Sequence, residues 1–429
     1  MQEIEGTLLK DHMEVRTAGP RPSGDCHAGH GGTEVARVAD RRILVVAPQP
    51  FYQDRGTPIA LRQVLEALSQ LCYRVDLLTF PQGEDIALPG LRIFRAGNPV
   101  GIRTVPIGFS LRKVALDASL VAALNTRLSR DSYTCVHAVE EAAFPAVVMG
   151  RRRGIRTLYD MQSSLPEQLL KHRVARIPPV PSALGAAERW LLNRADLVVA
   201  SVGLADRVRR VAPGTRAREW RFPSGTVADH SGEAEGLRRR LGLSDAAPVV
   251  LYSGTFEAYQ GLEHLIAAAP RILERVPSAR FVLVGADEAG RVEVETAAGE
   301  LVRDGILTIV DRQPRSVIPG YLALADVLVS PRAFGGNLPL KVFDYLAAGR
   351  PIVATDIATH RELLTDERAV LVAPTAEGLA AGVVSVLCDV EKSTALAEAA
   401  REYAVEHLGW GRFRQSVAEI YQEAHCPTA

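Results

Sequence analysis

Short runs of apolar residues alternate along the chain with longer segments whose apolar residues recur every three or four positions. Residues 43–47 read I-L-V-V-A, which is typical of a parallel strand buried on both faces. Residues 59–71 follow, with Leu61, Leu65 and Leu68 on one helical stripe. Because this alternation continues through the chain, the sequence predicts an α/β fold with parallel sheets and right-handed crossovers.

The pattern begins again in the second half, where residues 249–252 (V-V-L-Y) predict a strand and residues 262–272 a helix. Two doubly wound, Rossmann-like domains with a cleft between them are the simplest interpretation. Further strands are expected at residues 75–79, 91–95, 135–138, 157–159, 197–201, 281–284, 307–310, 325–330, 352–355 and 371–372. Further helices are expected at residues 110–128, 142–151, 204–211, 297–304, 317–324, 339–348, 376–386, 391–406 and 409–421.

Changes in composition set the expected domain boundaries. Residues 1–40 are polar and rich in Gly, His and Arg, without a sustained period, so we expect a disordered N-terminal extension. Turn-forming residues gather around residues 220–241, which places a first domain at 41–225 and a second at 226–395. The C-terminal helices make up the remainder, residues 396–429.

One stretch, residues 330–356, carries the clearest chemical signal. It reads S-P-R-A-F-G-G-N-L-P-L-K-V-F-D-Y-L-A-A-G-R-P-I-V-A-T-D, a strand, a glycine-rich loop, a helix that starts at Pro339 and a second strand. A glycine loop that leads into a helix N-terminus favours an anion such as phosphate. Lys341 and Asp344 lie three apart on the first turns, where they could meet a phosphate and sugar hydroxyls. An ordinary strand–loop–helix unit remains the alternative.

The charge balance argues against a nucleic-acid partner. Lys and Arg number 50 and Asp and Glu number 50, so the formal net charge is zero. The charge is uneven, because residues 151–221 hold 15 Lys and Arg against 6 Asp and Glu. This basic segment from Arg151 to Arg221 is either a solvated face or a contact surface for anionic lipid or a phosphorylated acceptor.

Cysteine usage and hydropathy predict a cytoplasmic protein. The 5 Cys are scattered, with no CxxC pair, so we expect reduced thiols and no zinc site. The sequence contains no apolar run of about 18 residues, the length that a transmembrane helix needs, and no secretion-signal pattern at its N-terminus.

The motif L-P-L-K-V-F-D-Y-L-A-A-G-R-P-I-V-A-T-D, residues 338–356, resembles the donor-binding unit of the GT-B-fold retaining glycosyltransferases of family 4. Residues 252–261 and the order of the strand-end loops resemble the same family. The resemblance implies transfer of a sugar from a nucleotide diphosphate sugar, held by the second domain, to a glycan, lipid-linked or small-molecule acceptor held by the first. It further implies no metal, no cofactor, and a C-terminal helix that crosses back to the first domain.

The sequence departs from the family pattern at charged positions. The family places two acidic residues eight apart, and here Gly336 stands at the first position and Asp344 at the second. The resemblance implies that Asp344 holds the nucleotide ribose. Thr255 and Gln260 stand where the family usually has Arg and Lys. Because an uncompensated diphosphate is costly in a closed cleft, we expect Lys341, with Arg332, to supply the missing positive charge.

In the first domain, the family often carries a His in the loop that corresponds to residues 160–165, and this sequence has Asp160 and Gln162 there. His137, followed by Glu140 and Glu141, ends an earlier strand and is a candidate for the acceptor side. Each of these side chains could instead serve as a helix cap or a pairing group. The predicted catalytic residues are Asp160, Gln162, His137 and Lys341.

The predicted donor-binding residues lie after the carboxyl end of an expected strand, in the glycine-rich loop, or on the first turns of the helix that follows this loop. They are Gly56, Thr57, Gly254, Thr255, Gln260, Gly285, Arg312, Arg332, Gly335, Gly336, Asn337, Leu338, Pro339, Leu340, Lys341 and Asp344.

The resemblance implies front-face attack through an oxocarbenium-like state, in which the leaving diphosphate takes the acceptor proton. Two alternatives stay open. A nucleotide-sugar epimerase of the same fold would need acid and base groups in the cleft, for which His137 and Glu140 are the candidates. A catalytically degenerate subunit would bind a nucleotide or a partner protein without turnover.

Overall fold

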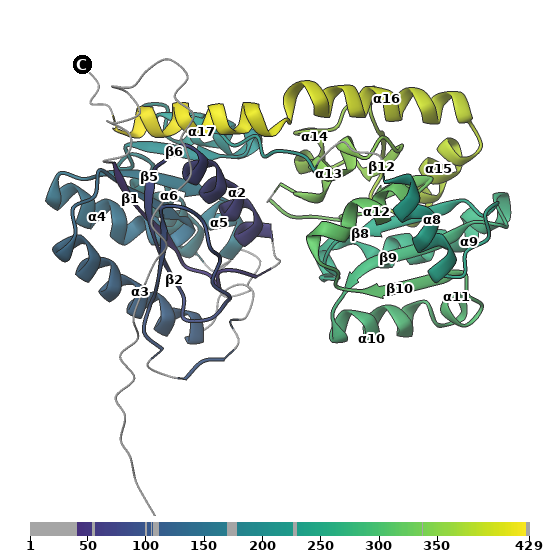
Figure 1. Cartoon of the computed structure of the whole chain (residues 1–429), viewed down its shortest axis with the longest axis horizontal. Helices are drawn as coiled ribbons and strands as arrows, with labels where there is room; N and C mark the ends of the chain where they lie inside the picture. The colour runs from purple at the N-terminus through teal and green to yellow at the C-terminus, as the bar shows by residue number, and fades with distance from the viewer. Residues whose placement is uncertain are drawn as a thin grey trace, which may run out of the picture.

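The computed structural model describes residues 41–53, 56–98, 101–103, 105, 111–169, 178–225, 230–336 and 338–425. The predicted extension at 1–40 and the predicted donor residue Asn337 lie outside these residues. The described chain forms two α/β domains beside each other (Figure 1), each built on one parallel sheet. The expected architecture is therefore confirmed.

The first sheet has seven parallel strands in the order β3-β2-β1-β4-β5-β6-β7. The strands are β1 (Arg42–Ala47), β2 (Arg74–Thr79), β3 (Leu91–Arg95), β4 (Cys135–Val139), β5 (Arg156–Met161), β6 (Leu197–Ala200) and β7 (Ala217–Glu219). Its helices are α2 (Gly56–Gln70), α3 (Leu111–Arg130), the 3₁₀ turn η1 (Glu140–Ala142), α4 (Ala143–Arg153), α5 (Leu165–Leu169), α6 (Val180–Leu192) and α7 (Val202–Val211).

The second sheet has six parallel strands in the order β10-β9-β8-β11-β12-β13. They are β8 (Val249–Ser253), β9 (Arg280–Ala286), β10 (Leu307–Asp311), β11 (Val327–Ser330), β12 (Ile352–Thr355) and β13 (Val370–Val372). The helices are α8 (Ser231–Arg240), the 3₁₀ turn η3 (Ala258–Gln260), α9 (Leu262–Arg275), α10 (Glu288–Ala297), α11 (Gly299–Arg303), the 3₁₀ turn η4 (Arg315–Val317), α12 (Ile318–Leu324), α13 (Lys341–Ala347), α14 (Ala358–Arg361), α15 (Ala376–Leu387), α16 (Val390–His407) and α17 (Trp410–His425).

The central strands are buried on both faces, as their continuous apolar sequences predict. Every residue from Ile43 to Ala47 in β1 and from Val249 to Ser253 in β8 is buried. The order of the strands reverses between β1 and β4 in the first sheet and between β8 and β11 in the second. Ligands bind outside the carboxyl ends of strands at such switch points.

The last two helices join the domains. Helix α16 packs against α13 of the second domain, whereas α17 packs against α2 and β5 of the first, and Figure 1 shows them running in succession along both domains. Glu423 of α17 pairs with Arg216 and Arg218 beside β7. The crossing itself is made by α17, and the expected boundary at residue 396 falls inside α16.

Several elements differ from the sequence-based expectation. The edge strand β7 reads A-R-E, and half of the residues of α10 are polar, so neither carries the apolar period that would have predicted it. Gly56 and Thr57 lie in the first turn of α2, not in the preceding loop. Helix α13 begins at Lys341, two residues after Pro339.

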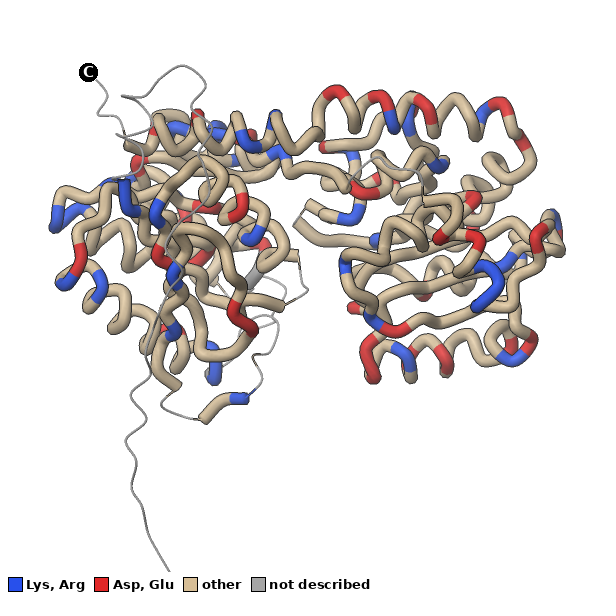
Figure 2. Tube along the Cα trace, in the orientation of Figure 1, with Lys and Arg blue, Asp and Glu red and all other residues tan. Residues whose placement is uncertain are grey.

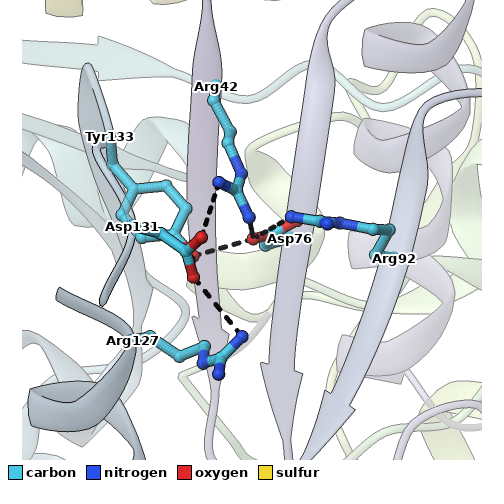
Figure 3. A network of polar contacts seen from close by, with 6 residues as sticks. All are labelled: Arg42, Asp76, Arg92, Arg127, Asp131 and Tyr133. Atoms are coloured by element: carbon cyan, nitrogen blue, oxygen red, sulfur yellow. Dashed lines mark hydrogen bonds and ion pairs between the residues drawn. The ribbon is translucent and has the colours of Figure 1, made fainter. Parts of the chain in front are cut away.

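At the amino-terminal ends of the first-sheet strands, a polar network surrounds the buried carboxylate of Asp76 (Figure 3). Arg42 Nη2 lies 2.6 Å and Arg92 Nε 2.9 Å from the two oxygens of Asp76, and the Tyr133 hydroxyl donates to it at 2.7 Å. Asp131 joins Arg42 and Arg127. The network lies at the opposite end of the strands from the switch point, so we assign it to stability.

Several arginines of the basic segment 151–221 pair with acidic residues. Arg207 pairs with Glu188, Arg209 with Asp206 and Glu219, and Arg216 and Arg218 with Glu423. Figure 2 shows acidic and basic residues interspersed over both domains. Among the described residues, no helix is long and apolar enough to cross a membrane.

Candidate active site

A cavity of about 920 Å³ lies between the carboxyl ends of the two sheets. Every predicted donor-binding residue that the structure describes lines it: Gly56, Thr57, Gly254, Thr255, Gln260, Gly285, Arg312, Arg332, Gly335, Gly336, Leu338, Pro339, Leu340, Lys341 and Asp344. Gln162 also lines the cavity, whereas His137 and Asp160 do not. The strand-end loops named from the sequence therefore meet at one place.

Two glycines form the part of the wall that follows β8 and β9. Gly254 has φ of 153° and Gly285 has φ of 118°, and a Cβ on Gly285 would overlap the carbonyl oxygen of Gly254. A Cβ on Gly254 would lie 3.0 Å from Lys341 Nζ. The two loops approach each other closely only because neither residue carries a side chain.

Lys341 is tied to the residues that replace the family's cations. Its Nζ donates to Gln260 Oε1 at 2.9 Å, and Gln260 Nε2 donates to Thr255 Oγ1 at 3.2 Å. The ammonium also lies 3.9 Å from the centroid of the Tyr252 ring. No carboxylate pairs with Lys341 among the described residues. Burial, and next the charge of Arg332, hold the pKa of Lys341 well below its ordinary value, while Glu257 opposes them.

Arg332 follows β11 and is only 5% exposed. Its guanidinium lies 5.1 Å from the centroid of the Tyr259 ring, and Nε donates to the Phe334 carbonyl at 3.2 Å. Burial lowers the pKa of Arg332. Arg332 and Lys341 thus bring positive charge to the same wall of the cavity, which suits an anionic ligand.

A buried histidine supports this wall from behind. His360 Nδ1 lies 2.7 Å from the Thr355 carbonyl oxygen, so Nδ1 carries the hydrogen and Nε2 accepts from the Ser330 hydroxyl at 2.9 Å. Thr355 Oγ1 in turn donates to the Arg332 carbonyl at 2.5 Å. Burial first, then the charges of Lys341 and Arg332, lower the pKa of His360 to about 4, with the Thr355 carbonyl opposing. Sequence reasoning missed His360, although the polar ends of two apolar strands, Ser330 and Thr355, are a signal for it.

Asp344 connects α13 to the segment between the domains. Its Oδ1 accepts from the backbone N–H of Gly225 at 3.0 Å, and Arg315 Nη2 lies 3.4 Å away. Burial raises the pKa of Asp344, and Arg315 and the Gly225 N–H oppose this effect. The carboxylate lines the cavity and is oriented by both partners.

Gly336 faces the first domain. A Cβ on Gly336 would lie 2.6 Å from Glu167 Oε2, so α5 lies directly against the loop after β11. Arg207 Nη1 is 3.7 Å from the other oxygen of Glu167. A side chain at position 336 would displace this contact.

The first-domain candidates occupy two layers. Strand β5 extends to Met161 and includes Asp160, which is 2% exposed, and His137 in β4 is fully buried. The prediction that Asp160 and His137 contact the substrate directly is therefore corrected, because only Gln162 lines the cavity. The physical reason is the longer strand, which turns Asp160 into the domain.

Glu140, which follows β4, reaches the cavity where His137 does not. Its backbone has φ of 50°, a conformation that is strained for a residue other than glycine. Ser163 Oγ donates to Glu140 Oε1 at 3.0 Å. Burial raises the pKa of Glu140 to about 8, with Ser163 and Lys113 opposing. A carboxyl group in this state can give or take a proton near neutral pH.

Across the described part of the chain, no group of three or more His, Cys, Asp or Glu is placed to hold a metal ion. The cavity offers cations, hydrogen-bonding amides and single carboxylates as its polar groups.

Two families of known proteins match the sequences of the two domains that form this cavity. Residues 247–389 match the family described as glycosyl transferases group 1, and residues 55–225 match the glycosyl transferase 4-like domain. The chain belongs to the group 1 glycosyltransferases. Each match covers one of the two domains, and the residues between the matches join the domains. This glycosyltransferase therefore consists of one domain of each type.

Curated relatives of this glycosyltransferase are transferases as well. The alpha-D-kanosaminyltransferase of Streptomyces kanamyceticus is 28% identical over 311 residues, 69% of this chain and 79% of the relative. The D-inositol 3-phosphate glycosyltransferase of Corynebacterium urealyticum is 25% identical over 403 residues, 86% of this chain and 90% of the relative. The chain is therefore a transferase, as the sequence predicted.

A solved structure confirms the GT-B fold. Sucrose-phosphate synthase from Thermosynechococcus elongatus superposes with a TM-score of 0.73 at 20% identity, over 89% of this glycosyltransferase and 98% of that chain. Anabaena HepE in complex with UDP and glucose superposes with a TM-score of 0.69 at 18% identity, over 89% and 99%. At these identities the likeness establishes the fold alone.

Proposed function

We propose that this enzyme transfers a sugar from a nucleotide diphosphate sugar to a hydroxyl acceptor, with retention of the anomeric configuration and without a metal. The observation that carries the proposal is Lys341, whose ammonium lines the cavity beside Arg332 with an amide, and not a carboxylate, as its hydrogen-bond partner. Two cations that burial penalises gain most from a multiply charged anion.

The donor fits the second domain. A diphosphate would lie between the loops after β8 and β11, where Gly254 and Gly285 allow close approach and Lys341 and Arg332 supply charge. Asp344, at the far side of α13's first turn, would accept hydrogen bonds from the ribose hydroxyls. The complex of Anabaena HepE with UDP and glucose supports a donor of this class for a chain with the same fold.

Independence from metal rests on charge compensation. A divalent cation usually neutralises a leaving diphosphate, and Lys341 and Arg332 would do so in its place. Both are held by fixed contacts, Lys341 to Gln260 and Arg332 to Tyr259, so little reorganisation is needed as charge develops on the leaving group.

The proposed chemical route is front-face attack. The acceptor hydroxyl adds to the anomeric carbon as the bond to the diphosphate breaks, and the leaving diphosphate takes the hydroxyl proton. The chain's own part is to orient both substrates and to keep water out while the domains close. Gln162 and Glu140 line the first-domain wall, where they would meet sugar and acceptor hydroxyls.

The first domain would hold the acceptor, a cell-envelope glycan, a glycolipid or a small molecule in the cytoplasm. The exposed arginines at the end of α4, residues 151–153, are the part of the basic segment that we propose for peripheral contact with anionic lipid. Among the described arginines of that segment, Arg207, Arg209, Arg216, Arg218 and Arg221 already pair with carboxylates. Binding to anionic vesicles that does not weaken with salt would argue against this contact.

The experiment is an incubation of the purified enzyme with a panel of nucleotide diphosphate sugars and candidate acceptors in EDTA. We expect release of one nucleotide diphosphate and a product whose anomeric proton shows the configuration of the donor. An inverted product would overturn retention, and activity only with added magnesium would overturn metal independence. Recovery of an isomerised donor would indicate an epimerase instead.

A further inference from the structure

A chain of buried hydrogen bonds runs from the C-terminal helix to the cavity wall. The hydroxyl of Tyr421 on α17 lies 2.6 Å from His137 Nδ1, and His137 Nε2 lies 3.3 Å from Asp160 Oδ2. Asp160 Oδ1 accepts from Gln162 Nε2 at 2.7 Å. Tyr421 and His137 are fully buried and Asp160 is 2% exposed, so Gln162 is the only member that the cavity exposes.

The Asp160 carboxylate determines which group donates and which accepts in each of these hydrogen bonds. A carboxylate only accepts hydrogen bonds, so the three nitrogens that face Asp160, those of Gln162, Trp220 and His137, must all donate to it. His137 then carries its hydrogen on Nε2. Its Nδ1 is an acceptor, and the hydroxyl of Tyr421 donates to it.

The same constraint fixes the side-chain amide of Gln162. Because one Nε2 hydrogen is donated to Asp160, the amide is held with its nitrogen toward Asp160, and Oε1, to which no described residue donates, is left to accept a hydrogen bond from a ligand in the cavity that Gln162 lines. A carbonyl oxygen in this position accepts a hydrogen bond from a hydroxyl and offers nothing to an ether or a carbonyl group.

We propose that Tyr421, through His137 and Asp160, holds Gln162 so that its carbonyl oxygen accepts a hydrogen bond from a hydroxyl of the substrate. The inference rests on the proposed glycosyl transfer and adds positioning residues to it. Gln162 contacts substrate, whereas Tyr421, His137 and Asp160 act through it. The C-terminal helix, which follows directly on a helix of the second domain, thereby contributes to the active site in the first.

The packing around Tyr421 allows a clean substitution. Its ring lies between those of Tyr73 and His137, with centroids 5.9 and 6.0 Å away, and Tyr421→Phe keeps this ring while it removes the hydroxyl. Without that donor, His137 Nδ1 is left without a hydrogen-bond partner and the ring loses the contact that anchors it, so its 3.3 Å contact with Asp160 is no longer held in place. The carboxylate and the Gln162 amide then lose their fixed orientation.

The test is a double-mutant cycle on kcat/KM for sugar transfer with Tyr421→Phe and Gln162→Met. We expect Tyr421→Phe to lower kcat/KM about tenfold in the wild-type background, the size of one lost hydrogen bond. In the Gln162→Met background it should change kcat/KM less than about twofold, because its effect passes through Gln162. Tyr403→Phe on α16, whose ring packs against His407 outside this chain of contacts, is the matched control and should leave kcat/KM unchanged.

Two further arms complete the design. The substrate hydroxyl that Gln162 contacts belongs either to the transferred sugar or to the acceptor. In the first case, hydrolysis of the donor without acceptor should fall in Tyr421→Phe. In the second case, this hydrolysis should stay unchanged. His137→Gln, whose amide can donate to Asp160, should retain transfer within about threefold, whereas His137→Leu should lose it as Tyr421→Phe does.

A Tyr421→Phe effect of equal size in both Gln162 backgrounds would overturn the proposal, since a purely structural role is additive. Equal losses in His137→Gln and His137→Leu would overturn it too. A wild-type enzyme that transfers sugar but shows no coupling refutes this inference alone. A wild-type enzyme that transfers nothing refutes the proposed function.

Discussion

Lys341 Nζ lies 2.9 Å from Gln260 Oε1, and this hydrogen bond joins the loop after β8 to the first residue of α13. The contact places an ammonium at a wall where a diphosphate would bind, although the positions after β8 carry Thr255 and Gln260. The positive charge on this wall therefore comes from Arg332 and Lys341 of the β11–α13 unit, and not from the loop after β8.

Replacement of Lys341 should weaken donor binding. Lys341→Met keeps the apolar stem over Tyr252 and removes the charge, so we expect nucleotide affinity to fall about 10- to 100-fold, as for a lost hydrogen bond to a charged group. Calorimetric titration measures the change. Lys392→Met, at the exposed start of α16, is the control and should bind as the wild type does.

Donor binding should also depend on pH through Lys341. Burial holds the pKa of this ammonium well below its ordinary value, and a bound diphosphate should raise it again. Binding then takes up a proton wherever the pH lies between the pKa of Lys341 in the free and in the bound protein, so affinity should fall as pH rises through that interval. Titrations in buffers of different ionisation enthalpy report the proton. An identical pH dependence in Lys341→Met would assign it to another group.

Gly285→Ala should distort the wall that the donor approaches. Its φ of 118° suits glycine and an added Cβ would overlap Gly254, so we expect a loss of stability of about 1–3 kcal/mol together with weaker nucleotide binding. Gly236→Ala, in α8 with open space around it, should instead stabilise by about 0.5–1 kcal/mol. Urea unfolding compares the two, and equal effects would remove the argument.

His360 should make the protein sensitive to acid. Its pKa is about 4 in the folded protein, below its ordinary value of about 6.5, so unfolding takes up a proton between these values. Stability should fall by up to about 3 kcal/mol as pH drops through this window and should not change with this group above it. His360→Gln should flatten the dependence, whereas the surface variant His264→Gln should not.

Asp76→Asn should destabilise the first domain without changing the site. Asp76 is buried between Arg42, Arg92 and Tyr133 (Figure 3), and breaking such a network costs about 3 kcal/mol or more. Asp366→Asn, an exposed partner of Arg361, should cost less than about 1 kcal/mol. If nucleotide affinity changed with Asp76→Asn under native conditions, the network would have a role beyond stability.

The strands that hold the site could be predicted because parallel strands buried on both faces leave continuous apolar runs, such as Ile43–Ala47. The glycine-rich loop, Lys341 and Asp344 could be predicted from their spacing before and within a helix. By contrast, the edge strand β7 has three residues and no apolar period, so nothing in the local sequence marks it.

The finer assignments failed where they depend on tertiary packing. Strand β5 continues through Asp160 and Met161, two residues beyond the predicted end, so that Asp160 is buried and Gln162 is the residue that lines the cavity. His137 could not be linked to Tyr421, which lies 284 positions away. His360 could not be placed beneath Arg332, because α14, a helix of four residues, is too short to show a period, and its contacts with Ser330 and Thr355 form only in the folded chain.

The central claim is that the second domain binds a nucleotide diphosphate through Lys341 and Asp344 without a metal. The most direct measurement is calorimetric titration of a panel of nucleoside diphosphates in EDTA into the wild type, Lys341→Met and Asp344→Asn. The account predicts that one nucleotide binds the wild type and that both variants bind it at least about tenfold more weakly. Equal affinity in all three proteins, or binding that requires magnesium, would contradict it.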